Sequence, residues 1–492
     1  MKRIIIILLL GTAGILTVPA QQVVLTLEQT IEIAADSSLQ AFIAQNLYQA
    51  SYWEYRSFKA ARLPSLTLNM TPIEYNRDIK RQYDSEQDIN VFRRQQSLYS
   101  SAGLTVRQNL DITGGSFFVQ SNLAYMRNFG DNIYTQFTSV PFRIGYSQSL
   151  FGFNSFKWEK RIEPLKFEKA QKKFLYDRED VAEQATQVFF DLATAQTEYD
   201  MAVDNVASSD TIYRTGEERF QIMSISQADL MTLKLDAINA RNTLRNAEIG
   251  LTRAIFAFVS FLNMEKDTPV RIELPDRPAN LNLNMDIALE QAFSNNPDFL
   301  DNAQRILEAE RNVDQTQKSS VFDASFYASV GYNQVAQNFS DAYRRPLQED
   351  IVNIGFSIPL IDWGVRKGRA NMAKNNLNVT RISVQQKEIS LEQDVIMTVN
   401  DFSIQQELIQ SAEEAMQIAN MAYNSTKERF IIGSADINSL TLSLNRQKEA
   451  QRNYISALKN YWLSYYKIRK LTLFDFEKQE KIAVEFDRKY GF

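Results

Sequence analysis

One long helical segment constrains the fold of this chain more than any other feature of the sequence. Residues 369–432 run for 64 positions without glycine or proline, and Gly433 then separates them from a second such arm at residues 435–470. At a rise of about 1.5 Å per residue, the first arm would be about 95 Å long as a helix. Ordinary helices have about 8–20 residues, so this length predicts a long coiled-coil hairpin rather than an ordinary buried helix pair.

Both arms carry the spacing that a coiled-coil seam requires. Small or apolar residues recur every three or four positions along the first arm, at Leu408, Ala412, Ala415, Ala419 and Ala422. The second arm has the same alternation at Leu440, Leu444, Gln447, Gln451, Tyr454, Leu458, Tyr461, Tyr465 and Ile468. A spacing sustained for that length predicts a partner helix along each arm.

The composition narrows the function. The chain has 492 residues, a formal charge of −5, no cysteine and no histidine. The missing cysteine excludes disulfides and thiolate sites, and the missing histidine removes the commonest general base and metal ligand. The mild acidity argues against nucleic-acid binding. Without a phosphate-binding glycine loop or a paired set of carboxylates, we expect neither an enzyme nor a bound cofactor or metal.

Residues 1–20 are typical of a secretory signal peptide. A basic start at residues 2–3 precedes an apolar run at residues 4–18, and a cut is expected before Gln21. A retained membrane anchor is the alternative, but the apolar run is short and interrupted by glycine. Because no later stretch of about 20 apolar residues follows, we expect an exported protein in which any membrane crossing uses strands.

The mature chain contains a duplication. Similar amphipathic segments open its two halves at Leu25 and Leu283, and both halves follow the order helix, strands, long helix, tight turn and returning helix. Such a repeat predicts two copies of one architecture. We therefore expect a first repeat at residues 21–270, a second repeat at residues 271–475 and a tail at residues 476–492.

Each repeat is expected to contain strands and a helical hairpin. The first has an insertion within its strands, at residues 76–140, and a hairpin at residues 154–264. The second has a helix at residues 285–319, strands at residues 322–361 and a hairpin at residues 369–470.

The strand segments alternate between apolar and polar residues. In the second repeat, Phe322, Ala324, Phe326, Ala328, Val330 and Tyr332 share one face. This alternation fits the half-buried sheet of a soluble protein, and it also fits a membrane barrel with a polar lumen. Export, and the isolation of the strands between helices, favour the barrel. Because so few strands cannot close one, identical chains would have to pool their strands and their hairpins.

These features resemble the TolC-type outer-membrane efflux proteins over essentially the whole mature chain. The resemblance is carried by the two half openings, by Leu63-Pro64-Ser65-Leu66, by the segment from Phe356 to Arg366, and by the repeated Glu218-Arg219-Phe220 and Glu428-Arg429-Phe430. It implies an α+β membrane protein in which three identical chains form one outer-membrane β-barrel. That barrel, with four strands per chain and twelve in all, would continue into a periplasmic α-helical coiled-coil barrel.

The resemblance also implies a function and partners. It implies the exit duct of a tripartite efflux or type I secretion system, located in the cell outer membrane with its helical part in the periplasm. The homotrimer would contact outer-membrane lipid, a periplasmic adaptor protein and an inner-membrane transporter, and would conduct substrates passively. The alternative is a non-conducting coiled-coil scaffold that spans the periplasm.

The insertion in the first repeat departs from the family. Alternating residues at 104–107 and 117–125 flank Gly114-Gly115, a turn signal. This extra hairpin would either join the barrel, giving six strands per chain, or project from it. The family count of four is the default expectation.

The resemblance implies that the turns at the hairpin tips contact the adaptor. The matching residues are Met223, Ser224, Gly433 and Ser434, which alternatively serve only to end helices. Met223 stands where glycine is common, and this predicts a different turn geometry in the first repeat.

Acidic rings at the periplasmic entrance are a further family feature. We expect the constriction to be lined by Asp229, Asp436, Asn438, Ser439 and Thr441. Asp229 matches the acidic position, whereas the second repeat has Ser439 and Leu442 there, and Asp436 is expected to cap a helix. Fewer carboxylates predict a weaker preference for cations.

Overall fold

The computed structural model describes residues 23–86, 88–129, 133–278, 280–319 and 322–482. The expected signal peptide and residues 483–492 of the expected tail lie outside the described residues. The chain forms two compact units, and each unit takes residues from both repeats. Among the described residues, the helical unit comprises residues 23–47, 173–296 and 392–482, and the sheet unit comprises residues 48–172 and 297–391. The predicted α+β fold class is confirmed.

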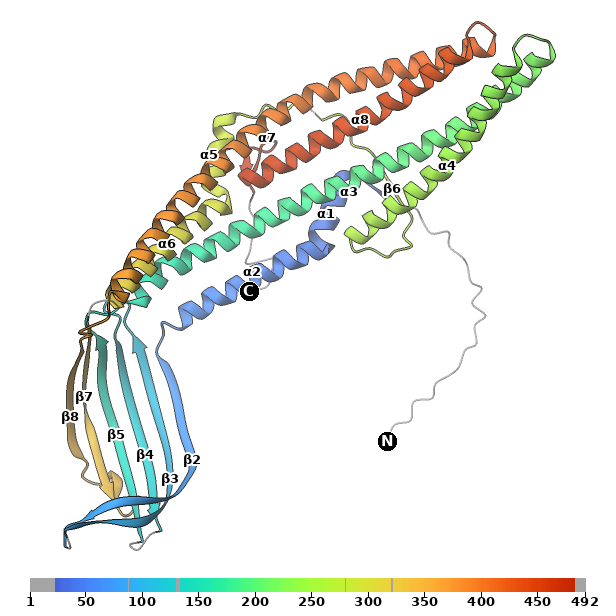
Figure 1. Ribbon diagram of the computed structural model, residues 1–492. Helices are drawn as coiled ribbons and strands as arrows, with labels where there is room; N and C mark the ends of the chain where they lie inside the picture. The colour runs from blue at the N-terminus through green and yellow to red at the C-terminus, as the bar shows by residue number, and fades with distance from the viewer. Residues whose placement is uncertain (1–22, 87, 130–132, 279, 320–321, 483–492) are drawn as a thin grey trace, which may run out of the picture. The chain divides into compact units, whose positions relative to one another are not determined.

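The sheet unit is built on one antiparallel sheet of six strands, shown in Figure 1. Its neighbours follow chain order: β2 (Ser65–Asp84), β3 (Ile89–Asn109), β4 (Ser116–Asn128), β5 (Tyr134–Ser149), β7 (Asp323–Ala336) and β8 (Leu347–Ser357). A short 3-10 helix, Asp341–Tyr343, lies between β7 and β8. Within the chain β2 and β8 are the edges of the sheet, so each has one row of backbone groups without a strand partner.

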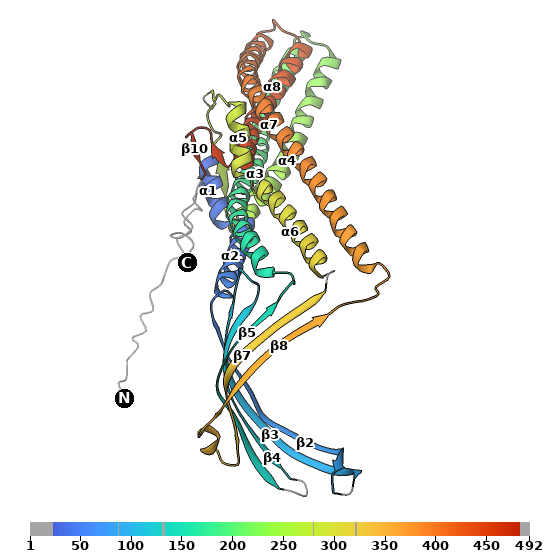
Figure 2. The same ribbon diagram turned by 90° about the vertical axis from the view of Figure 1, so that its left-hand side faces the viewer.

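The default expectation of four strands per chain is wrong for this sheet. The extra hairpin is formed by β3 and β4, which pair with each other and lie between β2 and β5. Beyond the end of β4, residues 77–84 of β2 continue to pair with residues 89–96 of β3, so the β2–β3 hairpin extends past β4 (Figure 2). The hairpin joined the sheet because its alternation is in register with both flanking strands.

Side chains on the sheet alternate between two faces. Large apolar side chains are exposed on every strand, including Leu66, Leu68, Met70, Val106, Phe117, Ile144, Val330, Val352, Ile354 and Phe356.

Two strands change register at a proline: the pairing of β2 shifts around Pro72, and that of β5 shifts around Pro141. Proline has no N–H to donate to the ladder, so it is tolerated at such irregularities.

Helices α2 (Leu39–Ala60), α3 (Ser155–Gln221), α6 (Pro297–Ser319) and α7 (Val365–Ile431) contribute residues to the sheet unit. Within this unit, the rings of Tyr55 and Phe167 stack with centroids 4.6 Å apart. The Trp158 indole donates a hydrogen bond to Asp314 (2.8 Å), which joins α3 to α6.

The helix expected at residues 285–319 is in fact two helices, α5 (Met285–Asn295) and α6. Asn296 between them has extended backbone angles (φ −64°, ψ 130°). The reason is Pro297, since a residue that precedes proline is pushed out of the helical region.

The helical unit contains two long hairpins, one from each repeat. In the first, α3 is followed by α4 (Gln227–Phe261), and in the second α7 is followed by α8 (Ile437–Thr472). Both α3 and α7 have 67 residues, as two copies of one architecture would. Among the described residues, none of the helices carries an apolar stretch long enough to cross a membrane.

Shorter elements complete the helical unit. They are α1 (Leu27–Ser37), α5, the parallel strand pair β1 (Val23–Leu25) and β6 (Val270–Ile272), and the antiparallel pair β9 (Phe474–Asp475) and β10 (Glu480–Lys481). Thr26 and Gln29 form the capping box that opens α1. Their side chains bind backbone amides at the start of the helix, which explains why polar residues stand there.

The predicted seam of the returning arm is confirmed at its large residues, because Leu440, Leu458, Tyr461, Tyr465 and Ile468 are buried. Along the first arm, Leu408, Ala415 and Ala422 of the predicted seam are exposed in the single chain, so this seam stays a prediction for the associated chains. Large buried side chains in the same part of that arm are Phe402, Ile409, Tyr423 and Phe430, which are separated by seven or fourteen positions. Burial of large rings removes more apolar area from water than burial of alanine, and this decides the face.

A cluster of charged residues lies at the C-terminal end of α8. Arg469 contacts the carboxylates of Glu179 (3.0 Å) and Asp475 (2.9 Å), and Lys470 contacts Asp180 (3.0 Å). Burial opposes the charged form of Asp475, but hydrogen bonds from the Lys478 backbone and the charge of Arg469 lower its pKa. The cluster fixes α8 against α3 through paired rather than isolated charges.

Candidate functional site: the hairpin tips and two polar hollows

The two hairpin tips have the same backbone geometry although their sequences differ. The amide N–H groups of Met223 and Ser224 donate to the carbonyls of Phe220 and Arg219, at 2.9 and 2.8 Å. Gly433 and Ser434 donate in the same way to Phe430 and Arg429, at 3.1 and 2.8 Å. This pair of bonds is the Schellman motif that ends many helices.

The expectation of a different turn at Met223 is therefore wrong. Met223 has φ +56° and Gly433 has φ +84°, so both lie in the left-handed region. The bonds of the motif hold Met223 there despite the steric cost that a side chain adds.

The returning helices begin with carboxylates that bind backbone amides. Ser226 and Asp229 form a capping box at the start of α4, with bonds of 3.1 Å in each direction. At the start of α8, the Ser439 amide donates to Asp436 (2.6 Å), so Asp436 caps the helix as expected. The hydrogen bonds from Ser439 lower the pKa of Asp436 below its usual value.

The remaining predicted tip and entrance residues lie at the surface of these turns. Met223, Ser224, Gly433, Ser434, Asn438 and Ser439 are exposed, and Thr441 is half-buried beside buried Leu440. Within one chain these residues form two separate groups, one at each tip.

An apolar cluster and one arginine join the two hairpins just behind the tips. Ile212, Leu233, Tyr423, Phe430 and Leu440 pack together with contributions from both repeats. Arg219 of α3 donates hydrogen bonds to the carbonyl oxygens of Phe430 (2.7 Å) and Ile431 (2.8 Å) at the end of α7. Its guanidinium carbon lies 5.2 Å from the centroid of the Phe430 ring, a cation–π distance.

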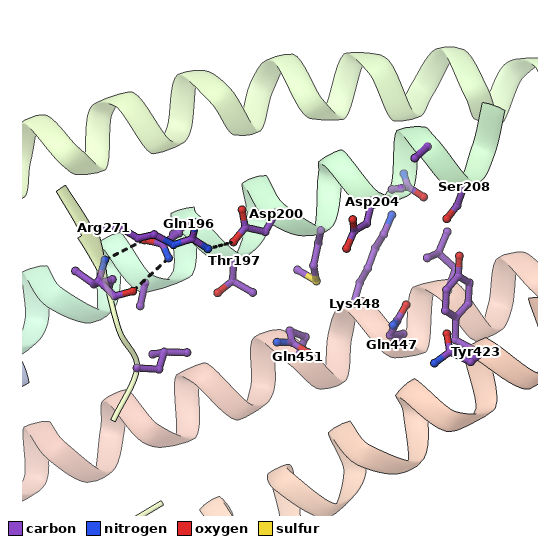
Figure 3. A pocket seen from close by; sticks show the side chains of 18 of the residues that line it. Gln196, Thr197, Asp200, Asp204, Ser208, Arg271, Tyr423, Gln447, Lys448 and Gln451 are labelled. Carbon is purple, nitrogen blue, oxygen red and sulfur yellow. Dashed lines mark hydrogen bonds and ion pairs between the residues drawn. The ribbon is translucent and has the colours of Figure 1, made fainter. Parts of the chain in front are cut away.

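A polar cavity of about 960 Å³ continues from this cluster between α3, α8 and β6 (Figure 3). Gln196 holds its β6 wall, because its side chain exchanges two hydrogen bonds with the backbone of Ile272 (3.3 and 3.2 Å). Arg271 contacts Asp200 across the same wall at 3.4 Å. Amide, hydroxyl and charged side chains dominate the lining, so the cavity suits water and polar solutes.

Lys448 crosses this cavity from α8. Figure 3 shows its amine directed toward α3, near Asp204. Partial burial and the nearby charge of Arg452 lower the pKa of Lys448, while Asp236 opposes this effect. The same lysine lines a smaller hollow of about 300 Å³ with Asp236, so the two spaces adjoin along one side chain.

A second hollow, of about 710 Å³, lies on one face of the sheet. Polar side chains of four strands line it, including Asn69, Thr71, Ser101, Thr105, Gln120, Asn122 and Arg143. The Arg143 guanidinium forms an ion pair with Glu349 of β8. One face of the sheet is thus hydrophilic, and it carries both an ion pair and a continuous set of hydrogen-bonding groups.

No described set of three or more Asp and Glu side chains is arranged to hold a metal ion. The sequence analysis gave no role to Arg219, Lys448 and Arg143, which the structure places behind the tips, in the polar cavity and in the sheet hollow. A signal existed for Arg219, since Glu-Arg-Phe occurs at the end of both long helices. For Lys448 and Arg143, nothing in the local sequence distinguishes them from other basic residues on helices and strands.

Comparison with known proteins gives one family and several similar folds. Residues 288–472 match the family model described as outer membrane efflux protein. The outer membrane channel CmeC of Campylobacter jejuni has 13% identity and a TM-score of 0.65, with 93% of this chain and 87% of CmeC covered. VceC, an outer membrane protein of Vibrio cholerae, has 13% identity and a TM-score of 0.65, with 93% of this chain and 97% of VceC covered. A membrane protein of Pseudomonas aeruginosa has 12% identity and a TM-score of 0.65, with 94% of this chain and 92% of that protein covered. Comparison with curated proteins gives no match.

Proposed function

We propose that this chain is an exit duct of the outer membrane, and the match of residues 288–472 to the family model of outer membrane efflux proteins supports this. It conducts substrates passively from the periplasm to the exterior, as part of a tripartite efflux or type I secretion system. CmeC, with the same fold, is itself described as an outer membrane channel. The six-stranded sheet is the part in the membrane, and the helices lie in the periplasm.

The observation that carries this proposal is the two-faced sheet with open edges. One face exposes apolar side chains and suits lipid, while the other has a polar hollow about Arg143 and suits water. Edge strands β2 and β8 carry backbone groups that need partners, which lipid cannot supply. Association of three chains edge to edge satisfies them. With six strands from each of three chains, the barrel has eighteen strands rather than twelve.

The proposed partners meet the hairpin tips. The exposed residues Met223, Ser224, Gly433 and Ser434 are where we place the contact with a periplasmic adaptor, which joins the duct to an inner-membrane transporter. Asp229, Asp436, Asn438, Ser439 and Thr441 line the entrance in this proposal. The duct itself uses no catalytic residue and no cofactor.

Recording from planar lipid bilayers tests the proposal. The purified mature chain is expected to insert and to give stable conductance steps, because the polar sheet face encloses water. A complex that enters the bilayer and stays electrically silent at every voltage would instead identify a non-conducting scaffold. In the same recordings, reversal potentials in a salt gradient should show a weak cation preference that Asp229→Asn reduces, since each carboxylate at a constriction attracts cations.

A further inference from the structure

The ends of α3 and α7 carry one motif in two different environments. Glu218-Arg219-Phe220 ends α3 and Glu428-Arg429-Phe430 ends α7, and both are followed by the same Schellman turn. At the end of α7 the motif is covered, because Arg219 reaches over from the other hairpin. Phe430 is only 2% exposed there.

The corresponding end of α3 lacks that cover. Phe220, the counterpart of Phe430, is 39% exposed, and Met223 in the adjoining turn is 93% exposed. Arg429, the counterpart of Arg219, is exposed and donates to the Ser434 carbonyl of its own turn (3.2 Å). Within the described part of the chain, no arginine is bonded to the carbonyls of Phe220 and Gln221.

The uncovered end is a good acceptor for a cation. The last carbonyls of a helix have unused acceptor capacity, and the helix dipole places partial negative charge on them. An arginine supplies several donors to these oxygens in one plane, and its flat face also covers an aromatic ring. Arg219 makes both kinds of contact on α7, so the chemistry of the pairing is established by the molecule itself.

We infer that Arg429 of one chain caps the C-terminal end of α3 in a second copy of the chain. Its guanidinium donates to the carbonyl oxygens of Phe220 and Gln221, the counterparts of Phe430 and Ile431, and covers the Phe220 ring. The contact repeats head to tail, since each chain offers Arg429 at one tip and an open α3 end at the other. The inference rests on the association of identical chains proposed above, and it names the residue that links their tips.

A second copy is the occupant that this surface fits best. The covering hairpin must bring an arginine, a phenylalanine and a Schellman turn at fixed spacing, and the chain carries that set twice. Within one chain the first hairpin covers the second, whereas Arg429 of the second hairpin is bonded to the Ser434 carbonyl of its own turn. Head-to-tail repetition with rotation closes a ring, in which every helix end of this type is capped.

Cross-linking between differently tagged chains tests the inference. Because the chain has no cysteine, introduced thiols are the only ones present. One chain carries Arg429→Cys, the other carries Gln221→Cys, and the two are produced together and treated with a short bis-maleimide. We expect a covalent product that contains both tags, which only contact between two chains can give.

A matched pair calibrates the reagent. Arg219→Cys and Ile431→Cys in the same chain should link within that chain, because the structure joins these positions, and mass spectrometry of the linked peptides detects this. The same two substitutions in separate chains should give no product with both tags.

Two results would overturn the inference, and they are distinguishable. If the tagged chains co-purify and the calibrating pair links, but positions 429 and 221 do not, the chains associate without this contact. The inference fails equally if the Arg429→Cys thiol captures another protein and never a copy. If the tagged chains do not co-purify at all, the association required by the proposed function fails too.

Discussion

Met223 and Gly433 occupy equivalent positions in the two tip turns, and both have a positive φ. Met223 carries a side chain there, whereas Gly433 has none. Glycine adopts a positive φ without steric cost, whereas a residue with a Cβ loses roughly 1 kcal/mol there. We predict that Met223→Gly stabilises the first tip by about 1 kcal/mol. Hydrogen exchange of the Ser224 amide, which bonds to Arg219, should then slow about fivefold.

The reverse substitution at the other tip is the control. A Cβ built on Gly433 would lie 3.3 Å from Arg219 Nη2, so Gly433→Met must displace that side chain as well as strain the turn. In Gly433→Met, hydrogen exchange of the Ser434 amide should accelerate. The size of this change should exceed the slowing of the Ser224 amide in Met223→Gly. Unchanged exchange in both variants would show that the turns are not limited by their left-handed residues.

For single residues, the sequence predicted which residue caps a helix better than it predicted backbone conformation. The N-cap role of Asp436 follows from its position before an apolar run, and it is found. The conformation of Met223 could not be predicted, because propensity favours glycine and the whole motif overrides it. The role of Arg219 depends on a helix end more than 200 residues away in the sequence, and no local pattern contains that information.

At the scale of elements, the charged cluster at the end of α8 predicts how stability depends on pH. The folded pKa of Asp475 lies below its ordinary value of about 3.9. Its contribution is therefore present above that ordinary value and is lost as pH falls through the lower folded value. The pKa of Lys470 is raised despite burial, because Glu183 and Asp180 favour its charged form, so its contribution is lost only in strong alkali.

We therefore predict thermal stability from this cluster that is level between about pH 5 and pH 9 and declines below about pH 4. With the other three tryptophans replaced by phenylalanine, the fluorescence of Trp462, which adjoins Tyr465, reports melting of this region. Asp475→Asn should lower stability at neutral pH and flatten the acid decline. An acid decline of equal depth in the variant would place its origin elsewhere.

The β3–β4 hairpin is the element that separates this chain from the family pattern. A variant without residues 87–130 would bring β2 and β5 together as antiparallel neighbours. Because barrel diameter grows roughly in proportion to strand number, four strands per chain in place of six should narrow the barrel by about a third. The largest polyethylene glycol that enters from the strand side during bilayer recording should then be smaller.

A shorter deletion controls for the loss of chain. Replacing residues 79–94 by Asn-Gly removes only the projecting part of β2 and β3 and supplies a favourable hairpin turn. Its pairing with β4 stays intact, so the polymer cut-off should not change. An identical cut-off in both variants and in the parent chain would mean that the helical unit, rather than the sheet, sets the width.

Helices and strands were predicted well where their hydrophobic pattern extended over many residues. The prediction was poorer where two faces of one helix carried a similar pattern. The 67-residue helices and the alternating strands follow from their patterns. Along α7, alanines and large side chains both recur with heptad spacing, and within one chain it is the large side chains that are buried. The extra strands were visible, but their pairing partners depend on the register of the whole sheet.

At the scale of the molecule, one chain leaves two kinds of surface unsatisfied. The sheet ends at β2 and β8 with open backbone edges, and the α3 end has an exposed phenylalanine beside its last carbonyls. No other part of the described chain covers either surface. The number of chains is the part that no residue pattern in a single sequence contains.

Cross-linking of β2 to β8 between chains tests the central claim most directly. Thiols are placed on outward apolar positions of the edges, Leu66, Leu68 or Met70 in one tagged chain and Val352, Ile354 or Phe356 in the other. The account predicts products with both tags for at least one register, and a ladder that ends at three chains when both substitutions are in one chain. Chains that assemble and conduct while no β2–β8 pair ever links would contradict it.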